Sequence, residues 1–137
     1  QEEMGLGVRV DRELRVKGGR GTITDSEGRK NEKAVWGRQA LWCGYSGVKN
    51  GHHIGLALMP HPENFRKSWF HARDYGFLVA NPFGRKAFTR GQPSRINVDK
   101  GQVFRLRYGV LVHGTAADRP VDLKAAYTDY LAVVGTR

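Results

Sequence analysis

The sequence predicts a mainly β protein: an antiparallel β-sandwich, complete or part of a larger one, with one helix at its C-terminal end. Its 18 glycines and 5 prolines are spread between short apolar stretches, so a turn signal recurs about every ten residues. The apolar stretches have the length of strands, and one of them alternates between apolar and polar residues. Only the C-terminal segment has the spacing of an amphipathic helix.

Two short strands with one buried face are expected near the N-terminus, because apolar residues there are spaced two apart. These residues are Val8 and Val10, then Leu14 and Val16. Polar turns are expected at residues 18–21 and 25–33. Further on, Asn50-Gly51 predicts a hairpin turn, and the following His52 and His53 are expected to be exposed turn residues.

Two nearly continuous apolar runs, residues 54–59 and 77–80, predict strands that are buried on both faces. A weaker strand is expected at residues 94–98, followed by a hairpin turn at residues 99–101. This turn leads into the clearest strand, residues 103–113. Its core face is expected to carry Phe104, Leu106, Tyr108, Val110 and Val112.

The C-terminal helix, the only helix expected, is predicted from its start signals and its apolar stripe. Pro120 suits a first helical turn, and Asp122 suits a helix N-terminus. We expect the apolar face to pack on a sheet. The residues of that face are Leu123, Ala126, Tyr127, Tyr130, Leu131 and Val134.

With 137 residues and 39% hydrophobic content, the chain is expected to form one β-rich domain over residues 1–137. No apolar run approaches the roughly 18 residues of a membrane-spanning helix, so no membrane is expected as a partner. The single cysteine, Cys43, excludes an internal disulfide framework and is expected to be buried. Because the chain begins at Gln1 without a leader, we expect it to be part of a longer protein.

The formal net charge of +10 would attract polyanions. The lysines and arginines are scattered singly along the chain, so nucleic acid is not an expected partner. Neither glycine-rich stretch opens a helix after a strand, as phosphate-binding loops do, and no cofactor is expected. The sequence leaves the oligomeric state open.

Residues 69–76 combine an indole, an imidazole, a guanidinium, a carboxylate and a phenol just before a buried strand. We expect His71 and Asp74 to be catalytic, because imidazole and carboxylate exchange protons near neutral pH. Arg73 is expected to bind sugar oxygens, and Trp69 and Tyr75 to stack on sugar rings. The segment is thus expected to form a loop site for a polar ligand.

Polar residues at the ends of neighbouring strands are expected to complete the substrate site, because ligands commonly meet a sheet at its loops. Asn81 ends the strand at residues 77–80, while His61 and Asn64 follow the strand at residues 54–59. His113, at the end of the strand at residues 103–113, is a further expected substrate-binding residue. The prediction requires that these side chains converge on one pocket.

Two other interpretations remain open. An Arg73–Asp74 pair and the Tyr75 hydroxyl could instead satisfy buried polar groups, which would make the chain a non-catalytic structural or interaction module. His61, His71 and His113 could alternatively serve a metal-dependent enzyme, because imidazole suits zinc or iron. No spacing typical of metal ligands is visible, so no metal residue is assigned.

Several motifs, taken together, resemble one known family. They are residues 36–47, His61-Pro62-Glu63-Asn64, residues 69–84 with their Asn-Pro-Phe-Gly ending, and residues 106–113. Over nearly its whole length, the chain resembles the family labelled "methane oxygenase PmoA". Methane oxidation itself is not expected, because the membrane monooxygenase subunits of that name need spanning segments and this chain has none.

The resemblance implies a β-sandwich protein of saccharide-degrading bacteria, periplasmic or secreted, and often encoded near sugar oxidoreductases and hydrolases. It also implies that this chain is the C-terminal half of a longer protein, which would leave strand edges and an apolar face uncovered. His52-His53 does not match the family's His-rich motif. The leading hypothesis is therefore a domain that binds or processes a saccharide, as a hydrolase or lyase would.

Overall fold

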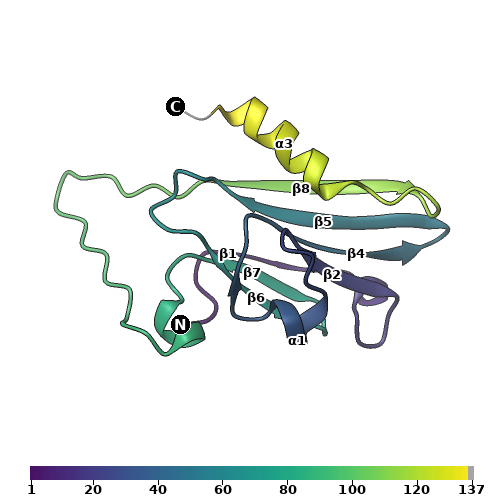
Figure 1. Cartoon of the computed structure of the whole chain (residues 1–137), viewed down its shortest axis with the longest axis horizontal. Coiled ribbons are helices and arrows are strands. Elements are labelled where there is room, and N and C mark those ends of the chain that lie inside the picture. The colour runs from purple at the N-terminus through teal and green to yellow at the C-terminus, as the bar shows by residue number, and fades with distance from the viewer. Residues whose placement is uncertain (136–137) are drawn as a thin grey trace.

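The computed structural model describes residues 1–135 and contains two four-stranded antiparallel sheets, with helix α3 on the outer face of one sheet (Figure 1). The first sheet has the order β1-β7-β6-β3, and the second has the order β2-β4-β5-β8. Side chains of both sheets share one core, to which Tyr45 and Leu58 come from the second sheet and Phe70 and Leu78 from the first. The predicted β-sandwich with a C-terminal helix is confirmed.

The first sheet contains the segment that the sequence singles out. Its strands are β1 (Leu6–Arg9), β7 (Phe77–Asn81), β6 (Trp69–Arg73) and β3 (Arg38–Gln39). Successive side chains of a strand point to opposite faces, and Phe70 and Ala72 of β6 enter the core. Trp69, His71 and Arg73 therefore face outward from the sandwich.

Two short helices flank that outward face. They are α1 (Asn31–Val35) and α2 (Arg85–Thr89). The ring of Trp36, which directly follows α1, and the ring of Phe88 in α2 both contact His71. The expectation that only the C-terminus is helical was wrong, because α1 begins within the turn expected at residues 25–33 and α2 follows the Asn81–Gly84 turn.

The second sheet is covered on its outer face by α3 (Leu123–Val134). Its strands are β2 (Gly21–Asp25), β4 (Cys43–Lys49), β5 (His52–Pro60) and β8 (Tyr108–Ala116). The Asp122 carboxylate caps α3 by accepting a hydrogen bond from the Ala125 amide at 3.0 Å. Tyr127 packs with Ala57 and Met59 of the sheet, so the predicted packing of the helix is confirmed.

The apolar runs and the hairpin were predicted correctly. Residues 54–59 lie in β5 and residues 77–80 lie in β7, and Leu58 and Leu78 are fully buried. Cys43 is also buried. Asn50 and Gly51 have φ angles of 52° and 73°, as a tight hairpin turn requires. His52 and His53, however, begin strand β5 and are not turn residues.

Other elements differ from the prediction. Leu14 belongs to a short 3₁₀ helix, η1 (Arg12–Leu14), and not to a strand. The weak strand expected at residues 94–98 has no regular structure, and the strand expected from Val103 begins only at Tyr108. Residues 99–101 do form a turn, because the Gln102 amide bonds to the Asp99 carbonyl at 2.9 Å, but no strand precedes it.

The expected core face of β8 was only partly correct, because Tyr108 packs against the core between the sheets but the two valines on the same face do not. Val110 and Val112 are 49% and 76% exposed, whereas Leu111, on the opposite face, packs against the cluster beneath α3. The alternation in the sequence was real, but the covered face is the one that meets the helix. Within residues 1–135, no helix has the length and apolar character that crossing a bilayer requires.

Candidate functional site

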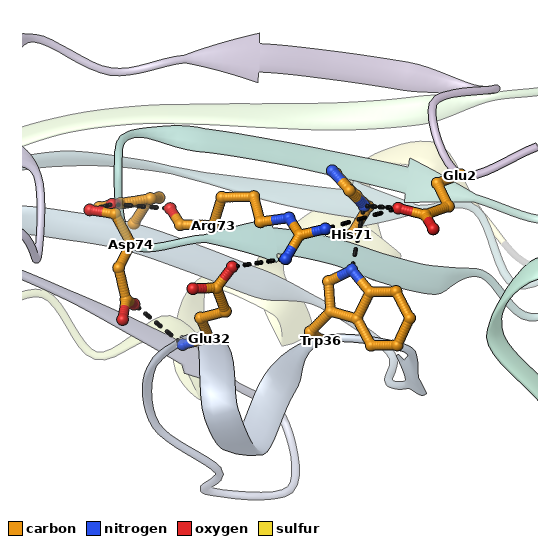
Figure 2. Close-up of polar contacts among 7 residues, drawn as sticks. Glu2, Glu32, Trp36, His71, Arg73 and Asp74 are labelled. Atoms are coloured by element: carbon orange, nitrogen blue, oxygen red, sulfur yellow. Dashed lines mark hydrogen bonds and ion pairs between the residues drawn. The ribbon is translucent and has the colours of Figure 1, made fainter.

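His71 lies in the middle of strand β6, and not in a loop as expected from the sequence. The residue is 2% exposed, and the rings of Trp36, Phe77 and Phe88 surround its side chain. The Trp36 indole N–H donates a hydrogen bond to Nδ1 of His71 at 3.1 Å (Figure 2). Burial, followed by the positive charge of Arg73, lowers the pKa of His71.

These contacts fix the protonation state of His71. A lowered pKa keeps the ring neutral near pH 7, and Nδ1 must then be the unprotonated nitrogen because it accepts from the indole. The proton therefore resides on Nε2. This nitrogen is buried and has no hydrogen-bond partner among residues 1–135.

Arg73 is the cation of the site, and its side chain is 32% exposed. Its Nη1 donates to the Glu32 carboxylate at 2.8 Å, and this hydrogen bond raises the pKa of the guanidinium. Its Nη2 lies 3.6 Å from the Glu2 carboxylate, which also lies 3.2 Å from Nδ1 of His71. The guanidinium stands 5.6 Å from the centre of the Trp36 ring, within range of a cation–π contact.

Asp74 holds the neighbouring helix in place and does not contact His71. Its carboxylate accepts a hydrogen bond from the Glu32 amide at 3.0 Å, which ties the first turn of α1 to the end of β6 (Figure 2). The sequence leaves open an ion pair between Arg73 and Asp74; in the structure Arg73 pairs with Glu32 instead. Tyr75 lies in the turn that follows, 48% exposed.

Trp69 and Asn81 face each other across β6 and β7 but are both enclosed. Trp69 is 7% exposed, and the guanidinium of Arg66 lies over its indole, 5.9 Å from the centre of that ring. The Asn81 side chain accepts from the Phe83 amide and donates to the Gln1 carbonyl, each at 2.8 Å. Both side chains are occupied in packing and in holding a turn.

His61 and Asn64 form a separate group at the end of β5. Nδ1 of His61 accepts from the Glu63 amide at 3.1 Å, and the Asn64 side chain makes two hydrogen bonds of 2.9 Å with the backbone of Arg107. His61 lines a hollow of about 170 Å³ together with Ser68 and Tyr127. The hydrogen bonds, ion pairs and ring contacts given above for this group involve no residue of the His71 group.

His113 lies in a third place, on the outer face of the second sheet. Its ring stacks on that of His53, with centres 5.6 Å apart, and both line a hollow of about 450 Å³ beside the start of α3. Burial, followed by the proximity of His53, lowers the pKa of His113. The structure therefore brings His71, Arg73 and Asp74 together and leaves His61, Asn64 and His113 elsewhere.

The lowered pKa values of His71 and His113 predict that the fold loses stability in mild acid. The unfolded chain, in which a histidine has a pKa near 6.5, takes up protons more readily than the folded chain, so the free energy of unfolding falls as the pH drops below about 6.5. Thermal melts between about pH 8 and pH 5 would measure this fall. The pH dependence should be weaker in His113→Asn than in the wild type.

The three histidines of the metal hypothesis lie in these three separate groups. Within residues 1–135, no group of three or more His, Cys, Asp or Glu side chains is arranged to hold a metal ion. The residues of the His71 group that sequence reasoning missed are Glu2, Glu32 and Trp36. Of these three, only Trp36 could have been found from the sequence, because it belongs to one of the family motifs. Nothing in the sequence distinguishes the two glutamates from other charged residues.

Comparison with known proteins gives a family but no named relative. No curated protein and no solved structure matches the chain. Residues 1–127, most of the chain, match a family described as a family of unknown function (DUF6807). The chain therefore belongs to the family of unknown function DUF6807.

Proposed function

We propose that the outer face of the first sheet around Arg73 binds a saccharide, and that the chain serves bacterial saccharide degradation outside the cytoplasm, as its resemblance to the family labelled "methane oxygenase PmoA" implies. One observation carries the proposal. A partly exposed guanidinium is paired with Glu32 at 2.8 Å and lies against the Trp36 indole, with an imidazole buried behind it. This set of groups is suited to a ring that carries hydroxyls.

Each group has a role in the proposal. Arg73 donates to sugar oxygens, Glu32 accepts from hydroxyls, and the exposed Tyr75 offers an aromatic face to the ring. His71 carries its proton on the buried Nε2, which must turn toward the ligand to supply the proton transfer that a hydrolase or lyase needs. Asp74, expected from the sequence to be the catalytic partner of His71, acts as a positioning residue through its bond to the Glu32 amide.

Calorimetric titration with a panel of oligosaccharides and their oxidised forms tests the proposal. Arg73→Ala should weaken binding about tenfold or more, because a hydrogen bond from a charged group is lost. Arg38→Ala, at an exposed arginine in strand β3 of the same sheet, should leave the affinity unchanged. Absence of any binding, or equal binding by Arg73→Ala, would count against the proposal.

A structural or interaction module is the second candidate, and specific contacts favour it. Asn64, Asn81 and Asp74 each bond to backbone groups at the end of a strand or the start of a helix, as residues that hold turns do. In that case His71→Ala should lower the melting temperature through the loss of packing against Trp36, while no saccharide binds to either form. The same titrations therefore separate the two candidates.

A further inference from the structure

The position of the Glu2 carboxylate marks a subsite for a ligand carboxylate. We propose that the saccharide bound at Arg73 is an acidic one, a uronic or aldonic acid, whose carboxylate displaces Glu2 and binds the Nε–Nη2 edge of the Arg73 guanidinium. This inference rests on the proposed saccharide function and names its substrate class. It is carried by the contacts of Arg73, of His71 and of Glu2 itself.

The Arg73 guanidinium has one strongly bonded edge and one weakly bonded edge. Nη1 is held by Glu32 at 2.8 Å, whereas Nη2 lies 3.6 Å from Glu2, beyond ordinary hydrogen-bond distance. Nε is buried and has no hydrogen-bond partner among residues 1–135. Nε and Nη2 are the two parallel donors that grip a carboxylate in the bidentate manner. The edge of the guanidinium that is suited to bidentate binding of a carboxylate is thus the edge with which Glu2 makes only a long contact.

The contact between Glu2 and His71 is also poor. Nδ1 of His71 already accepts the Trp36 N–H at 3.1 Å, and the Glu2 oxygen lies 3.2 Å from the same nitrogen. One nitrogen cannot accept from the indole and donate to a carboxylate at the same time. In the neutral ring, the lone pair of Nδ1 therefore faces a negatively charged oxygen, which disfavours Glu2 in this position.

Glu2 is placed so that a ligand can displace it. Its side chain is 40% exposed, and it belongs to the segment before β1 rather than to a strand (Figure 2). A ligand carboxylate could approach Nε and Nη2 of Arg73 more closely than Glu2 does, with its sugar ring near Trp36. The net charge of +10 favours the approach of an anionic ligand over that of a neutral one.

The test compares glucuronate, glucose and acetate in calorimetric titrations of the whole chain. Wild type should bind glucuronate more tightly than glucose or acetate. Glu2→Gln, which removes the competing charge but keeps the size, should raise the affinity for glucuronate about fivefold. Glu3→Gln, at the exposed neighbour, should change nothing. Arg73→Lys, which keeps the charge but loses the fork, should weaken glucuronate binding about tenfold.

The other outcomes overturn the inference in distinguishable ways. Equal binding of glucose and glucuronate, unaffected by Glu2→Gln, would reject the acidic ligand and keep the saccharide function. If acetate bound as tightly as glucuronate, the site would bind a carboxylate without recognising the sugar ring. No binding of any of the three, in wild type and in Glu2→Gln, would reject both the inference and the proposed function.

Discussion

Gly21→Ala should destabilise the fold by about 3 kcal/mol or more, because the first residue of β2 has no room for a side chain. A Cβ at Gly21 would overlap the backbone carbonyl of Leu14 and lie 2.8 Å from the carbonyl carbon of Arg15. The obstruction is backbone, which cannot rotate away as a side chain could. The Gly21 amide is also bonded to the Arg15 carbonyl at 2.9 Å, so the two segments cannot separate without losing that bond.

Urea unfolding of Gly21→Ala and of a matched control would measure the effect. Gly114, in strand β8, is the control, because a Cβ there would meet nothing within 4 Å. Gly114→Ala should leave the midpoint unchanged or raise it slightly, since alanine lowers the entropy of the unfolded chain. If both variants unfolded at the same urea concentration, the close packing of η1 against β2 described above would be wrong.

The elements that the sequence predicts well are those set by local patterns. Strands β5 and β7 come from apolar runs long enough for a strand, and both are buried as expected. Helix α3 comes from an apolar stripe behind Asp122, which caps it. In these elements the chemistry of neighbouring residues is sufficient to decide the backbone conformation.

Strand β6 could not be recognised, because its polar residues are stabilised by distant parts of the chain. His71 in the middle of a strand is hydrogen-bonded to Trp36, 35 residues away, and Arg73 is paired with Glu32, 41 residues away. In the sequence, such polar residues indicate a loop. The density of functional groups therefore singled out the segment that contains His71 and Arg73, but it predicted neither the backbone conformation of the segment nor its partners.

Strand β8 shows a different limit of sequence patterns. The alternation around Val110 and Val112 indicates that the two faces differ, but not which face is covered. Gly109 and Leu111 face α3, and a Cβ at Gly109 would lie 2.6 Å from the Tyr130 ring. The valines are left exposed. A small residue at the helix contact was the only sign of this arrangement.

Asp25→Ala should cost about 3 kcal/mol of stability and should also disturb the site, because Asp25 organises the turn that leads to α1. The carboxylate is fully buried, and it accepts hydrogen bonds from the amides of Glu27 and Arg29 and from the Arg29 guanidinium at 2.7 Å. Arg29 in turn donates to the Gln39 carbonyl in β3, which links the second sheet to the first. Removing Asp25 leaves these donors and a partly buried cation without a partner.

The effect should extend to Glu32 and Trp36, because α1 begins two residues after Arg29. Urea unfolding would give the stability, and Trp36→Phe would identify the Trp36 contribution to the near-ultraviolet circular dichroism spectrum, which Asp25→Ala should reduce. Asp129→Asn, at an exposed position of α3, should change neither quantity. If Asp25→Ala lost stability but kept the Trp36 signal, α1 would be held in place by other contacts, such as those of Glu32 with Asp74 and Arg73, and the turn at Asp25 would serve only to join the two sheets.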